Sequence, residues 1–386
     1  MNILLVSHGI PSKNDPQWGC FELDQARALS KLGHKISIMA VDGRYRNYYR
    51  KHGIEHTTTD KIDMYCLYLF PLTIIRFPKI RLWFIKRMTL FLFRKVIQQQ
   101  GLPDVIYVHY FGRMYHMSIV RRKYPKIPFV GIEHLSSINK DSISETMQYM
   151  GKVAYNSVDR LLAVSESLKR QMSRHFGKDA EVVYDMLGVE FANATIVKRN
   201  RDEKFKFVSV GSLLEIKGFN LLIKAFKNSN LAEKNCSLTI IGDGKERHNL
   251  QQLIDDNGLA NSVKLIGRKN KQEIINILRD SNAFVLASRG ETFGVVYIEA
   301  MSQGLPVIAT ACGGPEEFVD HTNGILIPVD DVEALKNALI EMFEKCNRYD
   351  NVFISAECNR RFAPQNIAIK LEKIFMDEIE KKKKQV

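Results

Sequence analysis

Residues 283–310 read AFVLASRGETFGVVYIEAMSQGLPVIAT, and this stretch decides the fold class. An apolar run over 283–287 predicts a strand buried on both faces, and a second run over 306–309 predicts another. Between them, a short loop leads into a helix that begins near Val295. A strand, a helix and a strand in succession predict a βαβ unit, from which parallel sheets are built.

The same alternation of strands and helices continues on both sides of this unit. Further apolar runs predict strands at 3–7, 35–40, 104–109, 127–132 and 161–164, and again at 207–211, 237–241, 263–266 and 324–327. Helical patterns fill most intervals, and a charged, irregular stretch over 183–206 interrupts them once. We therefore expect an α/β protein made of two Rossmann-like, doubly wound domains.

The irregular stretch places the domain boundary. We expect an N-terminal domain over 1–188, a C-terminal domain over 189–365, and a last helix with a basic tail over 366–386. In doubly wound sheets, ligands bind beyond the carboxyl ends of the strands. With two such domains face to face, the sequence predicts a site in the cleft between them.

Positive charge is concentrated in one part of the chain. The 386 residues carry a formal net charge of +13, with 56 Lys and Arg against 43 Asp and Glu. Residues 44–123 hold 16 of the basic and 4 of the acidic side chains, a net charge of +12, and the rest is nearly neutral. Such a charge suggests nucleic acid, a membrane surface or an anionic substrate as the partner, and its confinement excludes a uniformly basic coat.

Within this basic segment, residues 79–97 predict a helix with two apolar stripes. On a helical wheel one stripe holds Leu82, Ile85, Leu92, Phe93 and Val96, and the other holds Ile80, Phe84 and Phe91. One stripe can pack on the domain while the other enters an interface. We expect an anionic membrane surface or a lipid diphosphate there, since each nearby cation contributes about 1 kcal/mol at an acidic membrane. A partly buried helix with snorkelling cations is the alternative.

Cysteine spacing and hydropathy exclude several protein classes. The six cysteines form no Cys-x-x-Cys pair, which argues against a disulfide framework or a metal cluster. The chain opens with MNILLVS, a strand pattern and not a secretory signal. The longest apolar stretch, 64–75, is shorter than the roughly 20 residues that a span needs. We expect a cytoplasmic protein, peripheral at the inner face of the membrane.

The loop and helix start inside 283–310 predict an anion site. The free N–H groups of Phe293, Gly294 and Val295 would face an anion at the helix N-terminus, where the helix dipole favours negative charge. Glu291 and Glu299 flank this position and can accept hydrogen bonds from the hydroxyls of a sugar and a ribose. From spacing alone, a capping role for Glu291 and a solvated position for Glu299 remain open.

Longer motifs resemble those of a known enzyme family. The pattern Glu-x7-Glu over 291–299, followed by Glu-Ala-Met-x-x-Gly-x-Pro-Val-Ile-Ala, is similar to the retaining glycosyltransferases of family 4, also called group 1, which have the GT-B fold. Three further motifs occur in the family's order: Gly211-Ser-Leu-x-x-x-Lys217-Gly218, Gly242-Asp243-Gly244 and Gly313-Gly314-x-x-Glu317. The resemblance covers nearly the whole chain and is strongest over 207–330.

The resemblance implies roles for individual residues. Glu291 would bind the donor sugar's hydroxyls near the reaction centre, and Glu299 the nucleotide ribose. Lys217 would bind the donor diphosphate, which the backbone at Gly19 would approach from the other domain; a surface lysine is the alternative for Lys217. The implied donor-binding set also includes Gly211, Thr292, Phe293, Gly294 and Val295, with Arg268 and Lys269 near the base.

Polar residues at strand ends of the N-terminal domain form a second candidate group. His134 stands where the family often has a histidine facing the donor sugar, so the resemblance implies a catalytic role. A polar loop residue is the alternative interpretation of His134. Glu133 and His109 end strands on the same side of the sheet and are weaker candidates for the acceptor site.

The chain departs from the family at one cation. The family usually has Arg where this chain has Ser212, and we name Arg289 or Arg268 as possible replacements. No Asp-x-Asp stands where a metal-bound diphosphate would need it. We therefore expect Lys217 and helix dipoles to stabilise the leaving group, with no required metal or other cofactor.

Together the motifs imply a hexosyl- or N-acetylhexosaminyl-type glycosyltransferase. The expected donor is a nucleotide sugar, with UDP favoured and GDP or ADP possible, and the expected acceptor is lipid-linked or a saccharide in bacterial surface polysaccharide or glycolipid synthesis. The resemblance implies retention at C1, with the acceptor hydroxyl attacking on the leaving-group face. A GT-B epimerase or phosphorylase, which would turn over without an acceptor, is the alternative. A nucleic-acid-binding protein lacks support, because no known module with interleaved aromatic residues is present.

Overall fold

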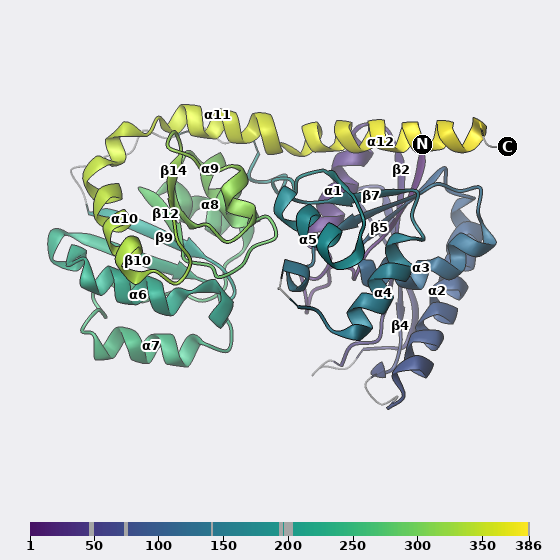
Figure 1. Ribbon diagram of the computed structural model, residues 1–386, viewed down its shortest axis with the longest axis horizontal. Helices are drawn as coiled ribbons and strands as arrows, with labels where there is room; N and C mark the ends of the chain where they lie inside the picture. The colour runs from purple at the N-terminus through teal and green to yellow at the C-terminus, as the bar shows by residue number, and fades with distance from the viewer. Residues whose placement is uncertain (46–49, 73–75, 140–141, 193–195, 197–203, 385–386) are drawn as a thin grey trace. The chain divides into compact units, whose positions relative to one another are not determined.

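The computed structural model describes residues 1–45, 50–72, 76–139, 142–192, 196 and 204–384. The chain divides into two compact units, Met1–Tyr184 with Pro364–Val386, and Asp185–Ala363. Each unit has a mostly parallel sheet covered by helices, which confirms the expected fold class (Figure 1). Most of the charged stretch expected as a linker over 198–206 lies outside the described residues.

The first unit contains a sheet in the order β3-β4-β2-β1-β5-β6-β7-β8. Its strands are β1 (Asn2–Val6), β2 (Lys35–Asp42), β3 (Gly53–Thr59), β4 (Ile62–Tyr68), β5 (Val105–His109), β6 (Phe129–Glu133), β7 (Arg160–Ala163) and β8 (Glu181–Val182). Its helices are α1 (Cys20–Lys31), α2 (Pro78–Gln100), α3 (Phe111–Lys123), α4 (Glu145–Tyr155), α5 (Glu166–Phe176) and α12 (Pro364–Lys384). The strand order reverses between β1 and β5, and ligands of doubly wound sheets bind at such switch points.

Strand β3 differs from the sequence-based prediction of a purely parallel sheet. It pairs antiparallel with β4 through a tight turn in which Asp60 and Lys61 have φ of 54° and 63°. Two left-handed residues are the signature of a type I′ hairpin. All seven residues of β3 are exposed, so its sequence GIEHTTT carries no apolar period from which a strand could be predicted.

The second unit contains a wholly parallel sheet in the order β11-β10-β9-β12-β13-β14. Its strands are β9 (Phe205–Val210), β10 (Cys236–Ile241), β11 (Val263–Leu265), β12 (Ala283–Leu286), β13 (Val307–Thr310) and β14 (Gly324–Ile327). Its helices are α6 (Phe219–Asn228), α7 (Arg247–Asp256), α8 (Lys271–Arg279), α9 (Val295–Ser302), α10 (Val332–Lys345) and α11 (Asn351–Phe362). Here the switch point lies between β9 and β12, and every residue of β12 is buried, as a strand covered on both faces requires.

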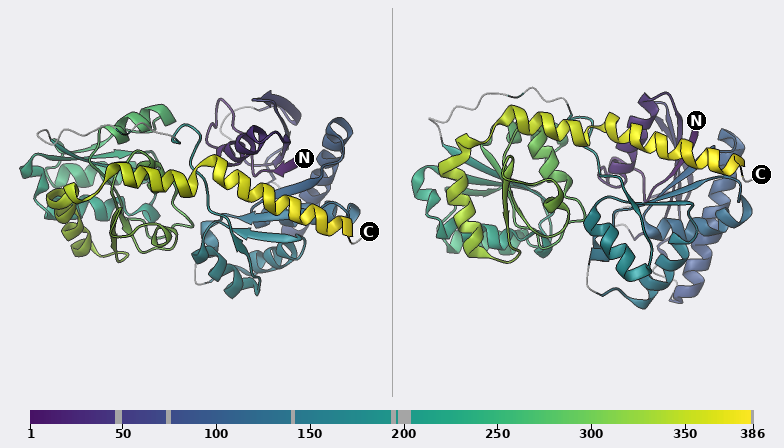
Figure 2. Two further views of the ribbon diagram at one scale, coloured as in Figure 1. Left: turned by 90° about the horizontal axis from the view of Figure 1, so that it is seen from above. Right: turned by 45° about the horizontal axis from the view of Figure 1, so that its top comes forward.

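The last helix, α12, packs on the first unit. Figure 2 shows it in yellow against the strands of that unit. Its Glu372 carboxylate lies 2.8 Å from His34 Nε2, and Lys370 Nζ donates to the Val182 carbonyl at 2.6 Å. The first and last segments of the chain therefore stabilise one another within the same unit.

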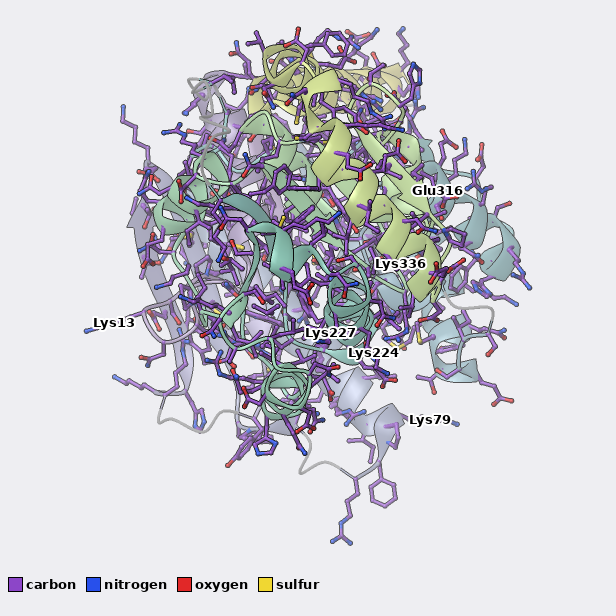
Figure 3. All side chains as sticks on the ribbon, turned by 90° about the vertical axis from the view of Figure 1, so that its left-hand side faces the viewer. Lys13, Lys79, Lys224, Lys227, Glu316 and Lys336 are labelled. Carbon is purple, nitrogen blue, oxygen red and sulfur yellow. The ribbon has the colours of Figure 1, made fainter. Side chains whose placement is uncertain are left out.

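The two predicted apolar stripes of helix α2 differ in solvent exposure. Leu92, Phe93 and Val96 are buried, whereas Ile80 is 53% and Phe91 43% exposed. Trp83, which lies beside the second stripe, is 60% exposed, and Figure 3 shows the labelled Lys79 extending outward near the start of the helix. In the part of the chain that the structure describes, no helix, α2 included, combines the length and the apolar character that crossing a bilayer demands.

Candidate active site

The loop after β9 carries the first predicted donor residues. Gly211 follows the strand, and Lys217 ends a short 3₁₀ turn, Glu215–Lys217. Gly218 then begins α6 with φ of 65°, and a Cβ there would lie 1.9 Å from the Ala287 carbonyl oxygen. Only glycine fits this position, so the loop is held against the end of β12.

This approach brings Lys217 and Glu291 together. Lys217 Nζ lies 2.6 Å from Glu291 Oε1, although 74 residues separate them in the sequence. Ser288 Oγ donates to the same carboxylate oxygen at 2.7 Å. The pair stands beyond the carboxyl ends of β9 and β12, at the switch point of the sheet. Its cation can stabilise a diphosphate, and its carboxylate can accept hydrogen bonds from hydroxyls.

A backbone hydrogen bond holds Glu291 in place, and backbone N–H groups just after it are available as donors. The Glu291 carbonyl accepts from Gly314 N at 3.1 Å. The residue that precedes α9 is Gly294, with φ of 98° and no side-chain cap, so Glu291 does not cap this helix. Within the described chain, the N–H groups of Gly294 and Val295 have no hydrogen-bond partner. Such groups at a helix N-terminus suit an anion.

Other members of the predicted donor set occupy different places around α9. The Phe293 ring is fully buried and packs against Phe318 and Phe362 at centroid distances of 5.2 and 5.5 Å, so only its backbone can face a ligand. Thr292 is half-buried in the loop before α9. Glu299 is half-buried in the second turn of the helix.

The basic residues predicted near the base lie farther along the sheet. Arg268 and Lys269 follow β11, which is separated from β9 by β10. Lys269 pairs with Glu273 at 3.3 Å, and Arg268 is exposed. The structure therefore does not bring Arg268 or Lys269 into contact with Lys217 or Glu291.

Arg289 already has partners inside the second unit. Its Nε lies 2.7 Å from Asp330 Oδ1, and its guanidinium also donates to the Glu215 carbonyl. Its backbone N–H donates to the Ile216 carbonyl at 2.7 Å. Arg289 thus holds the 3₁₀ turn that carries Lys217. This structural role differs from the diphosphate contact that the family arginine at the position of Ser212 would make.

In the first unit, the predicted residues His109 and His134 form a pair. His109 Nδ1 lies 3.0 Å from His134 Nε2, and the two rings are stacked with an angle of 3° between their planes. His109 ends β5 and is 1% exposed, whereas His134 follows β6 and is half-buried. Burial, together with the charge of His134, lowers the pKa of His109 to about 3, so this ring is neutral at physiological pH.

Glu133 has structural partners on every side. Its carboxylate accepts from the backbone N–H groups of Phe111, His134 and Leu135 and from the Tyr155 hydroxyl, at 2.8–2.9 Å. Burial raises the pKa of Glu133, and these donors oppose that rise. The carboxylate thus joins β6, α3 and α4, and it orients the backbone that carries His134.

Gly19 occupies a tight position at the start of α1. Its φ is 85°, and a Cβ there would lie 2.3 Å from the Gly9 carbonyl oxygen. The loop after β1 is therefore packed directly on the start of α1, which requires glycine. The predicted approach of the Gly19 backbone to a diphosphate stays a prediction.

Two features of the first unit were missed by sequence-based prediction. Glu22 on α1 is 1% exposed and is hydrogen-bonded to His8 Nδ1, which follows β1. Burial raises the pKa of Glu22, but the hydrogen bond and charge of His8 and the charge of His109 outweigh it and lower the pKa to about 2. Tyr110 has φ of 65°, a strained value for a bulky residue, and its ring lies 5.1 Å from that of His134. Glu22 looks like an ordinary first-turn acid in the sequence, and 14 residues separate it from His8.

Metal ligation has no support among the residues that the structure describes. In those ranges, no three or more His, Cys, Asp or Glu side chains are arranged to hold an ion. Lys217 and the helix N-terminus of α9 are the positive groups beside Glu291.

Comparison with known proteins adds an independent line of observation. The family profile described as Glycosyl transferases group 1 matches residues 192–356, and the profile described as Glycosyltransferase Family 4 matches residues 23–186. A glycosyltransferase of Methanocaldococcus jannaschii is 31% identical over 252 residues, 64% of this chain and 68% of that protein. The GDP-mannose-dependent monoacylated alpha-(1-6)-phosphatidylinositol monomannoside mannosyltransferase of Corynebacterium glutamicum is 30% identical, over 48% and 53% of the two chains.

A solved structure resembles the whole chain. The Anabaena protein HepE in complex with UDP and glucose superposes with a TM-score of 0.72 at 19% sequence identity. The match covers 98% of this chain and all of HepE. At this identity the likeness concerns the fold.

Proposed function

The chain belongs to the group 1 glycosyltransferases of family 4, and from this premise we propose that it transfers a sugar from a nucleotide sugar to a hydroxyl of a lipid-linked or saccharide acceptor. The transferred group would be a hexosyl or N-acetylhexosaminyl residue. Such a reaction would serve bacterial surface polysaccharide or glycolipid synthesis.

One observation carries this proposal: the contact between Lys217 and Glu291 at the switch point of the second sheet. A cation and a carboxylate 2.6 Å apart suit a donor whose diphosphate is negative and whose sugar presents hydroxyls. Donor binding would draw Lys217 toward the diphosphate and free Glu291 for the sugar. The N–H groups of Gly294 and Val295 would add dipoles that stabilise the departing diphosphate.

The proposed donor is a UDP-sugar, with GDP- and ADP-sugars as the other possibilities. Support comes from HepE, which shares the fold and was solved in complex with UDP and glucose. The name of the Corynebacterium relative specifies GDP-mannose, so the family likeness does not choose the base. Glu299, half-buried in the second turn of α9, would accept a hydrogen bond from the ribose.

The proposed chemistry retains the configuration at C1. As the bond between C1 and the diphosphate oxygen breaks, positive charge develops at C1 and negative charge on the leaving group. Lys217 stabilises the leaving group, and the acceptor hydroxyl attacks on the same face, passing its proton to the leaving phosphate oxygen. His134, held by His109, would hydrogen-bond the sugar or the acceptor.

We place the acceptor reaction at an anionic membrane, on the inner face. Segment 44–123 provides the contact, and exposed apolar side chains at and just before the start of α2 provide the apolar part of it. Phe77, Ile80 and Trp83 are 68%, 53% and 60% exposed, and α2 carries six cations and no acid. Aromatic side chains between cations are the composition that binds at the level of acidic lipid headgroups.

A donor screen and product stereochemistry test the transfer reaction. We expect a UDP-sugar to raise the unfolding temperature of the wild type by several degrees, and to raise that of E291A far less. Transfer to an acceptor extract should then release nucleoside diphosphate and give a product with the donor's anomeric configuration by NMR. An inverted product contradicts retention, and release only of free sugar contradicts a transferase.

Vesicle flotation tests the membrane contact. We expect binding to phosphatidylcholine vesicles containing about 30 mol% phosphatidylglycerol, weakening as salt rises, and little binding to pure phosphatidylcholine or to an oligonucleotide. W83D should weaken binding roughly 30-fold because a buried Trp contributes on the order of 2 kcal/mol. F353S, which removes another exposed aromatic, on α11, is the matched control and should bind as the wild type does.

A further inference from the structure

Arg113 occupies an unusual position in the first turn of α3. Among the described residues its guanidinium has one hydrogen-bond partner, the His8 carbonyl at 3.1 Å, and no carboxylate within ion-pair distance. Arg113 is half-buried, and burial lowers the pKa of its guanidinium. The positive end of the helix dipole also opposes a cation in the first turn. A charge so placed calls for an anion that the protein itself does not provide.

The nearest carboxylates are already engaged. Asp42 and Glu22 are the acids whose charge reaches Arg113. Asp42 pairs with Arg44 at 3.1 Å, and Glu22 is hydrogen-bonded to His8. Neither carboxylate therefore neutralises the Arg113 guanidinium by direct contact.

His116 lies close to Arg113, and Lys86 lies close to His116. His116, one helical turn after Arg113, is 6% exposed, and in the described chain neither of its ring nitrogens has a hydrogen-bond partner. Burial and the charges of Arg113 and Lys86 lower the pKa of His116 well below its usual value. Lys86 of α2 lies 3.6 Å above the Tyr115 ring and, as far as the described residues go, forms no ion pair. The described neighbours whose charge acts on His116 are thus both positive.

This basic cluster lies beside the histidine pair. Arg113 contacts the His8 backbone, the His8 ring lies 5.0 Å from that of Tyr110, and Tyr110 lies 5.1 Å from His134. All of these residues follow β1, β5 or β6, at the carboxyl end of the first sheet. A ligand group bound by Arg113 would therefore place the rest of that ligand near His134.

We propose that Arg113, with His116 one helical turn after it, binds a phosphate group of the acceptor. The guanidinium offers several N–H donors in a fixed plane, which matches phosphate oxygens, and His116 can donate from a ring nitrogen. The inference rests on the proposed transfer reaction, because it gives the acceptor of that reaction a phosphate. The phosphate can belong to a lipid headgroup or to a free phosphomonoester, and the chemistry of recognition is the same.

Phosphate binding by the full chain tests this assignment. Glycerol phosphate is titrated calorimetrically in the K217A background, so that the proposed diphosphate cation of the second unit is absent. R113Q should weaken binding roughly 10- to 100-fold, the range for a lost hydrogen bond between charged groups. K126Q, which removes an exposed charge just after the same helix and outside segment 44–123, should bind unchanged. An equal loss in K126Q, or affinity that R113Q leaves unchanged both for glycerol phosphate and for the vesicles described next, overturns the proposal.

A second arm identifies the source of the phosphate. Phosphatidylcholine vesicles with about 30 mol% phosphatidic acid replace glycerol phosphate, with the same variants. Dependence on Arg113 for vesicles alone assigns a lipid headgroup, and dependence for both probes assigns the phosphate group itself. Independence from Arg113 in both arms overturns the proposal.

A measurement on the wild type covers the case in which R113Q fails to fold. The Nε–H resonance of Arg113, assigned by its absence from R113K, should shift on addition of glycerol phosphate, and an unmoved resonance contradicts the site. A chain that binds phosphate through Arg113 yet transfers no sugar contradicts the transfer reaction only. A chain that transfers sugar but binds phosphate without Arg113 contradicts the phosphate site only.

Discussion

At the carboxyl end of the second sheet, Lys217 and Glu291 neutralise each other across 2.6 Å, whereas at the carboxyl end of the first sheet Arg113 has no carboxylate partner among the described residues. Both places are switch points of doubly wound sheets, between β9 and β12 and between β1 and β5. The same topology therefore presents two different surfaces to a ligand. One offers both signs of charge, as a nucleotide sugar requires, and the other offers unbalanced positive charge, as an anionic acceptor requires.

The two regions also differ in how they hold their ionisable groups. In the first unit, buried neutral rings and a buried carboxylate lie together, with the pKa of His109 lowered to about 3 and that of Glu22 to about 2. In the second unit, Lys217 is carried by a loop that Gly218 allows to approach the end of β12, and this approach brings Lys217 to Glu291. The stability of the first unit thus depends on pH, because these pKa values differ from those of the unfolded chain, and the geometry of the second unit depends on steric fit.

The largest expected effect concerns Glu291. Replacing it by Ala removes the carboxylate that holds Lys217 and that would bind the sugar, so the rate of transfer should fall on the order of 10²- to 10³-fold. The rate is measured as nucleoside diphosphate released in the presence of acceptor. E333Q, a change in an exposed pair with Lys336, serves as the control and should keep the wild-type rate. A folded E291A variant with unchanged rate removes Glu291 from the site.

The next largest expected effect is a difference in unfolding free energy between alanine variants at Gly218 and at Gly177. Both have left-handed φ, 65° and 63°, but a Cβ at Gly218 would meet the Ala287 carbonyl at 1.9 Å while one at Gly177 meets nothing within 4 Å. G218A should therefore lose about 3 kcal/mol of unfolding free energy, and G177A about 1 kcal/mol. Urea unfolding of both variants measures the difference. Equal losses show that the loop does not depend on its approach to β12.

A smaller effect tests the buried histidine of the first unit by pH. The folded pKa of His109 is about 3 and the unfolded value is near 6.5, so between these values the unfolded chain binds the extra proton. Stability from this source is full above pH 6.5 and falls as the pH is lowered. Between pH 6.5 and 5 this loss is about 2 kcal/mol, and H109F should remove it, leaving the loss that buried His116 adds in the same direction. Glu22 adds at most a few tenths of a kcal/mol over this interval, because it is largely ionised in both states at pH 5 and above.

Urea unfolding at pH 6.5 and 5 gives this comparison directly. H248Q, in which an exposed histidine of α7 is replaced, should keep the pH dependence of the wild type. A wild-type slope that H109F leaves unchanged shows that His109 is protonated in the folded chain.

Much of the second unit was predictable because its motifs are local. Strand, loop and helix follow one another within 283–310, so an apolar period and a single glycine place Glu291 beside the N-terminus of α9. Family likeness implied that Lys217 and Glu291 bind the same donor, but their contact was not predicted, because 74 residues lie between them. Its physical cause, the approach of Gly218 to the Ala287 carbonyl, appears only when two strand ends meet in space.

Less of the first unit was predictable, because its decisive features do not follow from local sequence motifs. Strand β3 is exposed and polar, so it has no apolar period. Arg113 is one cation among many in a basic segment, and its lack of a carboxylate partner within the described chain is a fact of tertiary packing. The helix over 79–97 was predicted with two apolar stripes, but its exposed stripe was distinguishable from its buried one only in the structure.

The central claim is that Lys217 and Glu291 jointly bind the donor, and a double-mutant cycle on donor affinity tests it most directly. Affinity for the UDP-sugar selected by the screen is measured calorimetrically for the wild type, K217A, E291A and the double variant. We predict that each single change weakens binding at least about 10-fold and that the two effects are not additive, because the residues contact one another and the same ligand. Wild-type affinity in the double variant would contradict the account.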